Sequence, residues 1–135
     1  MAKFARGLVD TSVLIDLESV DLESLPEEVA VCAISMAELS AGPHATSDHE
    51  ERARRQARLQ FIEACLSPIP FDADCARAYG VIFAAVSAVG RKPRGARAVD
   101  LMIAATSLSS DLPLFTRNAA DFTGLESLIP IVPVP

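Results

Sequence analysis

The chain has 135 residues, half of them hydrophobic, and a formal net charge of −6. This length predicts one domain, residues 1–135, that buries about two-thirds of its unfolded surface. The apolar runs end well short of the ~20 residues that span a bilayer, which argues against a membrane protein. The N-terminus lacks the apolar stretch of a secretory signal, so we expect a cytoplasmic location. The three cysteines form no C-x-x-C pair, which argues against a disulfide framework or a zinc site.

The first buried segment of the sequence ends in a carboxylate. Residues 7–16 read Gly-Leu-Val-Asp-Thr-Ser-Val-Leu-Ile-Asp. A short strand over residues 8–9 would place Asp10 at its carboxyl end, the edge where ligands bind in open α/β sheets. A helix over residues 12–20 follows, with Ser12 as its cap. Taken alone, Asp10 has two interpretations, a helix N-cap or a functional carboxylate.

A second strand and helix repeat this arrangement. The β-branched run over residues 29–34 predicts a strand that is buried on both faces. Ser35 is then expected to cap a helix in which Glu38 stands at the spacing of a capping box. Gly42-Pro43 ends that helix. Glu38 would therefore lie one turn beyond the carboxyl end of a strand.

The middle of the chain predicts two amphipathic helices with little strand between them. Residues 44–51 are polar and loop-like, and a helix is expected over residues 52–66. Residues 68–71 are flanked by prolines, which allows at most an edge or stub strand. Asp72 opens the next helix, whose apolar stripe indicates packing against another helix or a dimer seam. The stripe consists of Cys75, Tyr79, Ile82, Val86 and Val89.

The last third predicts a loop, a helix and two strands. Residues 90–95 form a basic loop, and a helix rich in small residues follows over residues 97–106, with Asp100 in its first turn. Positive partial charge at a helix N-terminus favours a carboxylate there. Short strands are expected over residues 113–116 and 129–134.

Strands that alternate with helices predict an α/β fold with three layers, α/β/α, around a short and mainly parallel sheet. Four separated segments then return polar side chains to one edge of the sheet: Asp10, Glu38, Asp100, and Asn118 with Asp121. Carboxylates held close together repel one another, so either their pKa values rise or a cation lies between them. Oxygen ligands of this kind favour Mg²⁺ or Mn²⁺ and phosphoryl chemistry.

Two clusters of basic residues stand out against the acidic total. Arg91, Lys92, Arg94 and Arg97 lie just before Asp100, where they are predicted to bind a phosphate beside the metal; a solvated loop is the alternative. The other cluster lies in the helix over residues 52–66. It is most simply a solvated helix face that pairs with the preceding glutamates. Its members are Arg52, Arg54, Arg55 and Arg58.

Four short motifs follow one another in order: residues 9–12 with 14–16, residues 34–39 with Gly42, residues 100–105, and residues 116–118 with Asp121-Phe122. Together they make the chain similar to the PIN-domain ribonucleases, and it specifically resembles the VapC-type toxins of toxin–antitoxin pairs. The resemblance covers nearly the whole chain and implies a PIN-like three-layer fold. It also implies an Mg²⁺-dependent endoribonuclease that cuts structured RNA, tRNA or rRNA, by attack of a metal-activated water.

The resemblance further implies partners and roles. The partners are the RNA substrate, a second copy in a homodimer, and a cognate antitoxin in a heterotetramer or larger assembly; the arginine-rich helix would form part of the groove for the antitoxin's tail. Asp10 and Asp100 would be the principal metal ligands, and Glu38 would hold a second ion or orient the water. The fourth acidic position falls at Asn118 or Asp121, of which we favour Asp121. Thr11, Ser12 and Thr116 would support the site by hydrogen bonds, and the basic loop would bind RNA.

Other classes fit the residues less well. A receiver domain needs a late lysine near its acidic pocket, but Lys3 and Lys92 are the only lysines. A dehalogenase-like phosphatase needs a second aspartate two residues after Asp10, where Ser12 stands. An RNA-processing PIN nuclease outside a toxin–antitoxin pair and a non-catalytic PIN-like binding module remain as alternatives. Intact Asp10, Glu38 and Asp100 argue against the module.

Overall fold

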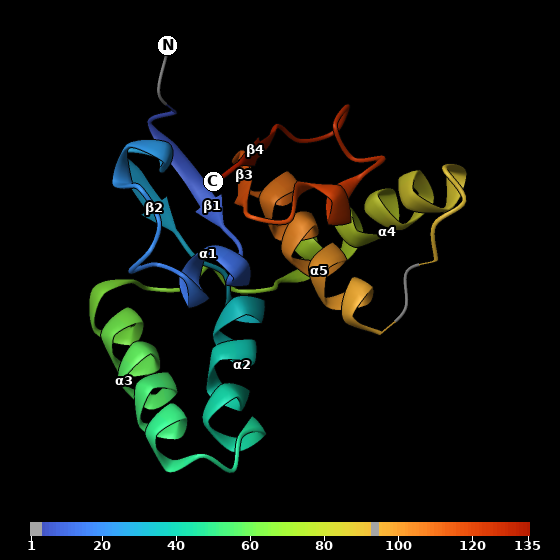
Figure 1. Ribbon diagram of the computed structural model, residues 1–135. Coiled ribbons are helices and arrows are strands. Elements are labelled where there is room, and N and C mark those ends of the chain that lie inside the picture. The colour runs from blue at the N-terminus through green and yellow to red at the C-terminus, as the bar shows by residue number, and fades with distance from the viewer. Residues whose placement is uncertain (1–3, 93–94) are drawn as a thin grey trace.

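A computed structural model describes residues 4–92 and 95–135 of the chain. Its centre is a parallel sheet with strand order β2-β1-β3-β4 (Figure 1). The predicted three-layer α/β fold with a parallel sheet is therefore confirmed. The strands are β1 (Arg6–Val9), β2 (Glu28–Ala30), β3 (Leu114–Thr116) and β4 (Ile131–Pro133).

Helices cover both faces of this sheet. In Figure 1, α2 and α3 form a hairpin that projects below the sheet, and α4 and α5 lie together at the right of the view. None of the helices in the described residues is long and apolar enough to cross a membrane. The helices are α1 (Thr11–Ile15), α2 (Ala33–Ala41), α3 (His49–Cys65), α4 (Ala73–Ala88) and α5 (Ala96–Ser109), with the 3₁₀ helices η1 (Leu22–Ser24), η2 (Gly42–Ala45) and η3 (Ala119–Phe122).

The alternation of side chains along the strands separates two hydrophobic cores. Leu8 and Leu114 point into a core that they share with α4, α5 and η3. Their neighbours Val9 and Phe115 point into the other, which α1, α2 and α3 complete. Burying each of these side chains stabilises the fold by roughly 1.5–3 kcal/mol relative to leaving it exposed. The short strands are thus held by packing on both faces.

The second predicted strand is shorter than expected. It ends at Ala30, and Cys32 forms an isolated parallel bridge with Ile69, as expected of a stub strand over residues 68–71. The backbone N–H of Ala33 donates to the Ile69 carbonyl at 2.8 Å, so α2 begins at Ala33 without a side-chain cap. The prediction of Ser35 as a cap in a capping box is therefore wrong, and Ser35 lies fully buried within the helix.

The helix predicted over residues 12–20 spans only Thr11–Ile15. Its N-cap is Asp10, whose side chain accepts a hydrogen bond from the backbone N–H of Val13. The prediction of Ser12 as the cap is wrong, because the helix begins at Thr11, directly after Asp10, and Ser12 lies inside its first turn. Asp10 is thus a helix cap by geometry, whatever further role it has.

The remaining boundaries differ from the predictions by a few residues. The helix η2 follows α2 directly and extends into the first two residues of the predicted loop, and α3 begins three residues earlier than expected. Asp72 caps α4 through the N–H of Cys75, as predicted. Of the predicted apolar stripe, Cys75, Ile82 and Val86 are buried, whereas Val89 follows the end of the helix and is half exposed.

Gly7 provides a test of how tightly the sheet packs. A Cβ atom on Gly7 would overlap the Phe115 ring and lie 3.1 Å from Pro26 Cγ. Overpacking of this kind costs about 1–3 kcal/mol, so we expect Gly7→Val to lower the free energy of unfolding by that amount in urea denaturation. The control is Gly80→Ala in α4, where an added Cβ meets no atom within 4 Å. That change should stabilise the helix by up to about 1 kcal/mol, and equal effects of the two changes would contradict the packing described here.

Candidate active site at the carboxyl edge of the sheet

Asp10 is a buried carboxylate at the end of β1, and its side chain is held from both sides. Asp10 is only 4 % exposed. Its Oδ1 accepts hydrogen bonds from Ser12 Oγ (2.5 Å) and from the Val13 N–H (3.3 Å), and its Oδ2 accepts one from Thr116 Oγ1 (2.5 Å). Burial raises the pKa of Asp10 and the hydrogen bonds oppose that rise. The carboxylate is therefore fixed in orientation.

The same hydroxyl groups join the ends of the two central strands. Thr116 Oγ1 also accepts a hydrogen bond from the backbone N–H of Asn118 (3.0 Å), and Ser12 Oγ accepts one from the N–H of Arg117 (3.0 Å). Asn118 itself is exposed at the start of η3 and makes no side-chain cap bond there. The loop that follows β3 is thus tied to the turn that follows β1.

Glu38 reaches this edge from α2. Thr11 Oγ1 donates a hydrogen bond to Glu38 Oε1, and the buried Ser35 Oγ lies 3.1 Å from the same Thr11 hydroxyl. Glu38 is exposed to solvent. Thr11 therefore connects the first turn of α1 to the carboxylate of α2.

Asp100 is partly buried and is the fifth residue of α5, just beyond the first turn in which it was predicted, because the helix begins one residue earlier than expected. Its pKa is raised from 3.8 to about 6, first by burial and then by the negative charges of Asp121, Glu38 and Asp10. Arg97 opposes this rise. The predicted acidic positions are thus close enough for each to act on Asp100 electrostatically.

The donor set suits a hard divalent cation. Within residues 4–92 and 95–135, no three His, Cys, Asp or Glu side chains are arranged to hold one ion. Mg²⁺, however, is usually bound by one or two carboxylates and retains several waters, so it does not require such a cluster. An all-oxygen edge on which a carboxylate has a raised pKa fits an ion of this kind.

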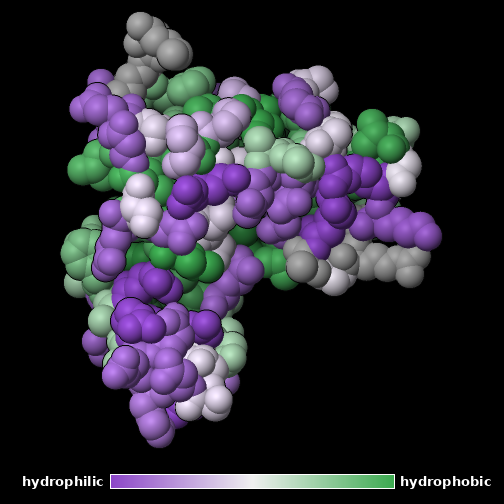
Figure 2. Space-filling view, in the orientation of Figure 1, coloured by the Kyte–Doolittle hydropathy of each residue, from purple (hydrophilic) through white to green (hydrophobic). Residues whose placement is uncertain are grey.

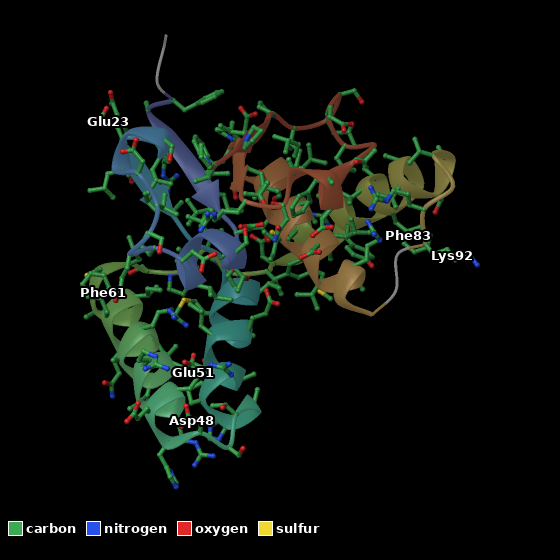
Figure 3. All side chains as sticks on the ribbon, viewed as in Figure 1. Glu23, Asp48, Glu51, Phe61, Phe83 and Lys92 are labelled. Carbon is green, nitrogen blue, oxygen red and sulfur yellow. The ribbon has the colours of Figure 1, made fainter. Side chains whose placement is uncertain are left out.

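The basic loop before α5 is arranged differently from the expectation. Arg91 and Arg97 donate hydrogen bonds to backbone carbonyls of η3. Lys92 is exposed and extends away from the body of the molecule (Figure 3). Arg94 lies outside the described residues. A phosphate-binding role for this loop stays a prediction.

The arginines of α3 divide into two groups. Arg52 donates to the carbonyls of Pro43 and Thr46, and Arg55 donates to that of Gly42, so both brace the turn between α2 and α3. Polar side chains gather over this hairpin in Figure 2. The remaining two, Arg54 and Arg58, line a pocket between α1 and α3.

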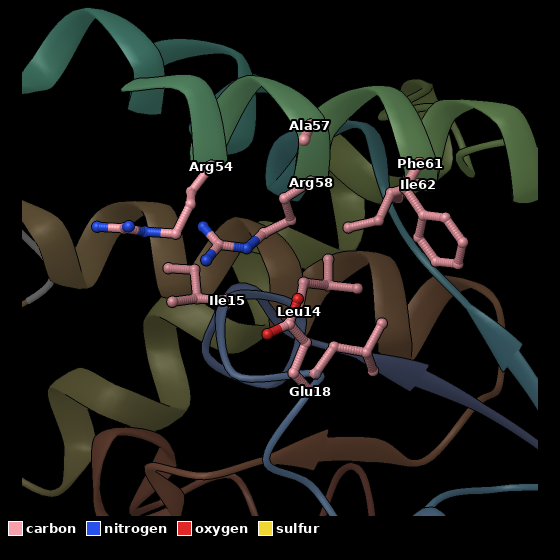
Figure 4. Close-up of a pocket in the computed structure, with 9 residues that line it drawn as sticks. Leu14, Ile15, Glu18, Arg54, Ala57, Arg58, Phe61 and Ile62 are labelled. Atoms are coloured by element: carbon pink, nitrogen blue, oxygen red, sulfur yellow. The ribbon is translucent and has the colours of Figure 1, made fainter. Parts of the chain in front are cut away.

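A groove runs from this pocket to the acidic edge. The pocket between α1 and α3 has a volume of about 530 Å³, and the pocket next to it, of about 290 Å³, includes Thr11 and Glu38. Ile15 and Arg58 line both pockets, so we treat the two as one α1–α3 groove, of which Figure 4 shows the larger part. Phe61, 59 % exposed, forms part of its wall. The other lining residues are Leu14, Leu17, Glu18, Leu39, Gly42, Glu51, Arg54, Arg55, Ala57 and Ile62.

Some contacts of the site were not predicted. Arg117 forms an ion pair with Asp16 (3.0 Å), which ties the end of α1 to the loop after β3. The sequence carried a partial signal, because both residues stand within the motifs of the first and last segments. Their pairing depends on how the strands align, which no local spacing encodes.

A three-layer α/β fold with carboxylates at the carboxyl edge of its central strands defines the class of protein. The sequence model of the PIN domain family matches residues 7–124. Ribonuclease VapC5 of Mycobacterium tuberculosis is 35% identical over 125 residues, covering 90% of this chain and 89% of the relative. Ribonuclease VapC of Rickettsia bellii is 26% identical over 125 residues, covering 90% and 91%. The chain belongs to the PIN-domain family, within its VapC-type ribonucleases.

The solved structures agree with this assignment. VapBC-5 from Mycobacterium tuberculosis, a member of the VapBC family of toxin–antitoxin systems, superposes with a TM-score of 0.85 at 33% identity. The match covers 96% of this chain and 99% of that chain. FitAcB from Neisseria gonorrhoeae superposes with a TM-score of 0.68 at 26% identity and covers 92% and 94% of the two chains.

The raised pKa of Asp100 predicts that, in the metal-free protein, this residue lowers the free energy of unfolding as the pH rises. Because the folded pKa of about 6 exceeds the unfolded value of 3.8, the folded state binds the proton more tightly. The contribution of the protonated Asp100 to the free energy of unfolding is fully present below pH 3.8 and is lost as the pH rises through about 6. In EDTA, Asp100→Asn should therefore stabilise the protein at pH 7.5 by more than at pH 4. Urea midpoints measure the difference.

The control for this experiment is Asp111→Asn. Asp111 is exposed, lies in the turn after the other end of α5, and has a positive φ that asparagine also adopts. This variant shows what the loss of one carboxylate at the surface does to the urea midpoint at each pH. A stabilisation by Asp100→Asn that is the same at both pH values would contradict the raised pKa of Asp100, which burial and then the neighbouring carboxylates cause.

Proposed function

We propose that this chain is an Mg²⁺-dependent endoribonuclease that hydrolyses a phosphodiester bond in structured RNA, tRNA or rRNA, as the toxin of a toxin–antitoxin pair. The observation that carries the proposal is the gathering of four carboxylates at one edge of the sheet, where burial first, and then the charges of Asp121, Glu38 and Asp10, raise the pKa of Asp100. A bound cation relieves such repulsion. The relatives named as VapC ribonucleases support RNA as the substrate.

In this proposal Asp10 and Asp100 hold the ion, and Glu38 and Asp121 complete its surroundings or orient the attacking water. When bound, the ion lowers the pKa of a water and neutralises charge that develops on the phosphate. Mn²⁺ shares the preference for oxygen ligands and should substitute. Asp121 is favoured over Asn118 because its charge acts on Asp100 and an amide binds a cation less strongly.

The chain's hydroxyl groups orient these carboxylates. Ser12 and Thr116 donate to opposite oxygens of Asp10, and Thr11 donates to Glu38. Hydrogen bonds from residues behind the ligands fix ligand orientation, and their loss typically costs roughly 10–100-fold in metal affinity or activity. The positions assigned to support the site therefore act by preorganisation.

The first test is cleavage of RNA by the purified protein, freed of any partner, with Mg²⁺ or Mn²⁺. EDTA should stop cleavage, and Asp10→Asn or Asp100→Asn should reduce its rate by about 100-fold or more, because each removes a ligand charge. Asp111→Asn is the matched control and should cleave at the wild-type rate. Undiminished cleavage by both site variants, or in EDTA, would refute the proposed mechanism.

We also propose that a cognate antitoxin covers the α1–α3 groove and that the toxin pairs as a homodimer, giving a heterotetramer or larger assembly with the antitoxin. The groove combines apolar Leu14, Ile15 and Phe61 with the guanidinium groups of Arg54 and Arg58 (Figure 4). This chemistry suits a chain segment with both apolar and acidic side chains. The relative VapBC-5 supports the pairing, since it is a toxin–antitoxin system.

The neighbouring gene supplies the test of this pairing. We expect a small gene beside this one whose product co-purifies with the chain and suppresses RNA cleavage. Arg58→Glu should weaken the complex by about tenfold or more, because it places a negative charge against an acidic segment. The control is Arg77→Glu, on the exposed face of α4 away from the groove. Absence of such a gene, or equal binding by both variants, would argue for an RNA-processing nuclease outside a toxin–antitoxin pair.

A further inference from the structure

Two arginines hold η3, the short helix that carries Asp121. Arg91 Nη1 donates a hydrogen bond to the carbonyl of Ala120 (2.8 Å), and Arg97 Nη1 donates one to the carbonyl of Asp121 (3.3 Å). Arg91 lies in the loop between α4 and α5, and Arg97 lies in the first turn of α5. We name this pair, Arg91 and Arg97, the η3 clasp.

The element that they hold has little stability of its own. η3 spans four residues, and its N-cap Asn118 provides no side-chain hydrogen bond. Short 3₁₀ helices have poor hydrogen-bond geometry and depend on their surroundings. Phe122, 1 % exposed, anchors one side of η3 in the core that also contains α4 and α5. Asp121 directly precedes Phe122. Its position therefore depends also on the hydrogen bonds that the carbonyls of Ala120 and Asp121 accept.

The chain after η3 also packs closely against the end of α4. Gly124 adopts a φ of +99°, and a Cβ atom there would lie 2.9 Å from Val89 Cγ2. Val89 lies two residues before Arg91. Two independent contacts therefore place the start of the basic loop beside η3. One is the apolar packing of Val89 against Gly124, and the other is the hydrogen bond from Arg91 to the Ala120 carbonyl.

We propose that Arg91 and Arg97 are positioning residues that hold η3 so that Asp121 faces Asp100. The inference deepens the proposed function and rests on it, because the position of Asp121 matters to activity only if Asp121 serves the metal site. The expectation that both side chains contact RNA phosphates stays a prediction beside this role, because each guanidinium uses only one of its five N–H donors on a protein carbonyl.

The positive charge of Arg91 and Arg97 and their hold on Asp121 have opposite effects on the affinity for a divalent cation. Measurement of that affinity therefore separates a role in positioning from an effect of charge alone. A guanidinium near a cation site repels the incoming ion, and the charge of Arg97 does act on Asp100. If these arginines acted only by charge, their removal would tighten binding of a divalent cation. If they hold Asp121 in place, their removal weakens it.

The experiment measures Mn²⁺ affinity by calorimetry, without RNA, for the wild type and the double variant Arg91→Ala/Arg97→Ala. We expect the double variant to bind Mn²⁺ about tenfold more weakly, within the range for residues that orient a ligand. Lys92→Ala is the matched control, since it removes one positive charge from the same loop, and its affinity should stay within twofold of the wild type. Arg97→Lys, which retains a donor, should recover part of the loss when Arg91 is intact.

A double-mutant cycle connects the clasp to Asp121. In an Asp121→Asn background the clasp variant should cause no further loss of Mn²⁺ affinity, because the group that it positions has already been altered. A clasp variant that binds Mn²⁺ as tightly as the wild type or more tightly would overturn the proposal. So would a loss of the same size in the Asp121→Asn background.

Hydrogen exchange separates failure of the clasp from failure of the proposed function. In the metal-free protein, amides of residues 119–122 should exchange faster in the clasp variant than in Lys92→Ala, because local opening becomes easier. Unchanged exchange overturns the clasp. Failure of the wild type to bind Mn²⁺ counts against the proposed function, whereas faster exchange in that case still supports the clasp as a device that holds η3.

Discussion

The hydrogen bonds to the buried carboxylate of Asp10 are the constraint on which the rest of the site depends. A buried charge is tolerated only where hydrogen bonds replace its hydration. Ser12, the Val13 N–H and Thr116 provide them, and two of these three donors lie in the first turn of α1. The third comes from the end of β3, so the register of the two central strands and the orientation of Asp10 are fixed together.

The remaining carboxylates are arranged around this fixed point at an electrostatic cost. Asp100 is the fifth residue of α5, just beyond its first turn, and burial and its acidic neighbours raise its pKa to about 6. A fold that gathers like charges loses stability at neutral pH unless a cation joins them. The acidic edge and the net charge of −6 therefore suit a protein whose complete site includes a divalent ion.

Much of this arrangement could be predicted from the sequence. Asp10, Glu38, Asp100 and Asp121 each stand where a local pattern places the end of a strand or the start of a helix, and the sheet order brings those positions together. Errors arose where a distant group replaced a local one. Ser35 fits a capping box, but the carbonyl of Ile69 already satisfies the first N–H of α2. The contacts of Arg91 and Arg97 with η3 were not predicted, because they depend on tertiary packing that spacing does not encode; a phosphate-binding role for these arginines stays a prediction.

The central claim is that the acidic edge holds a divalent cation, and crystals soaked in Mn²⁺ test it most directly. The anomalous scattering of the metal locates it without reference to activity. We predict a peak between the carboxylates of Asp10 and Asp100, present in the wild type and lost in Asp100→Asn. A peak elsewhere on the molecule, with none at this edge at millimolar Mn²⁺, would contradict the account.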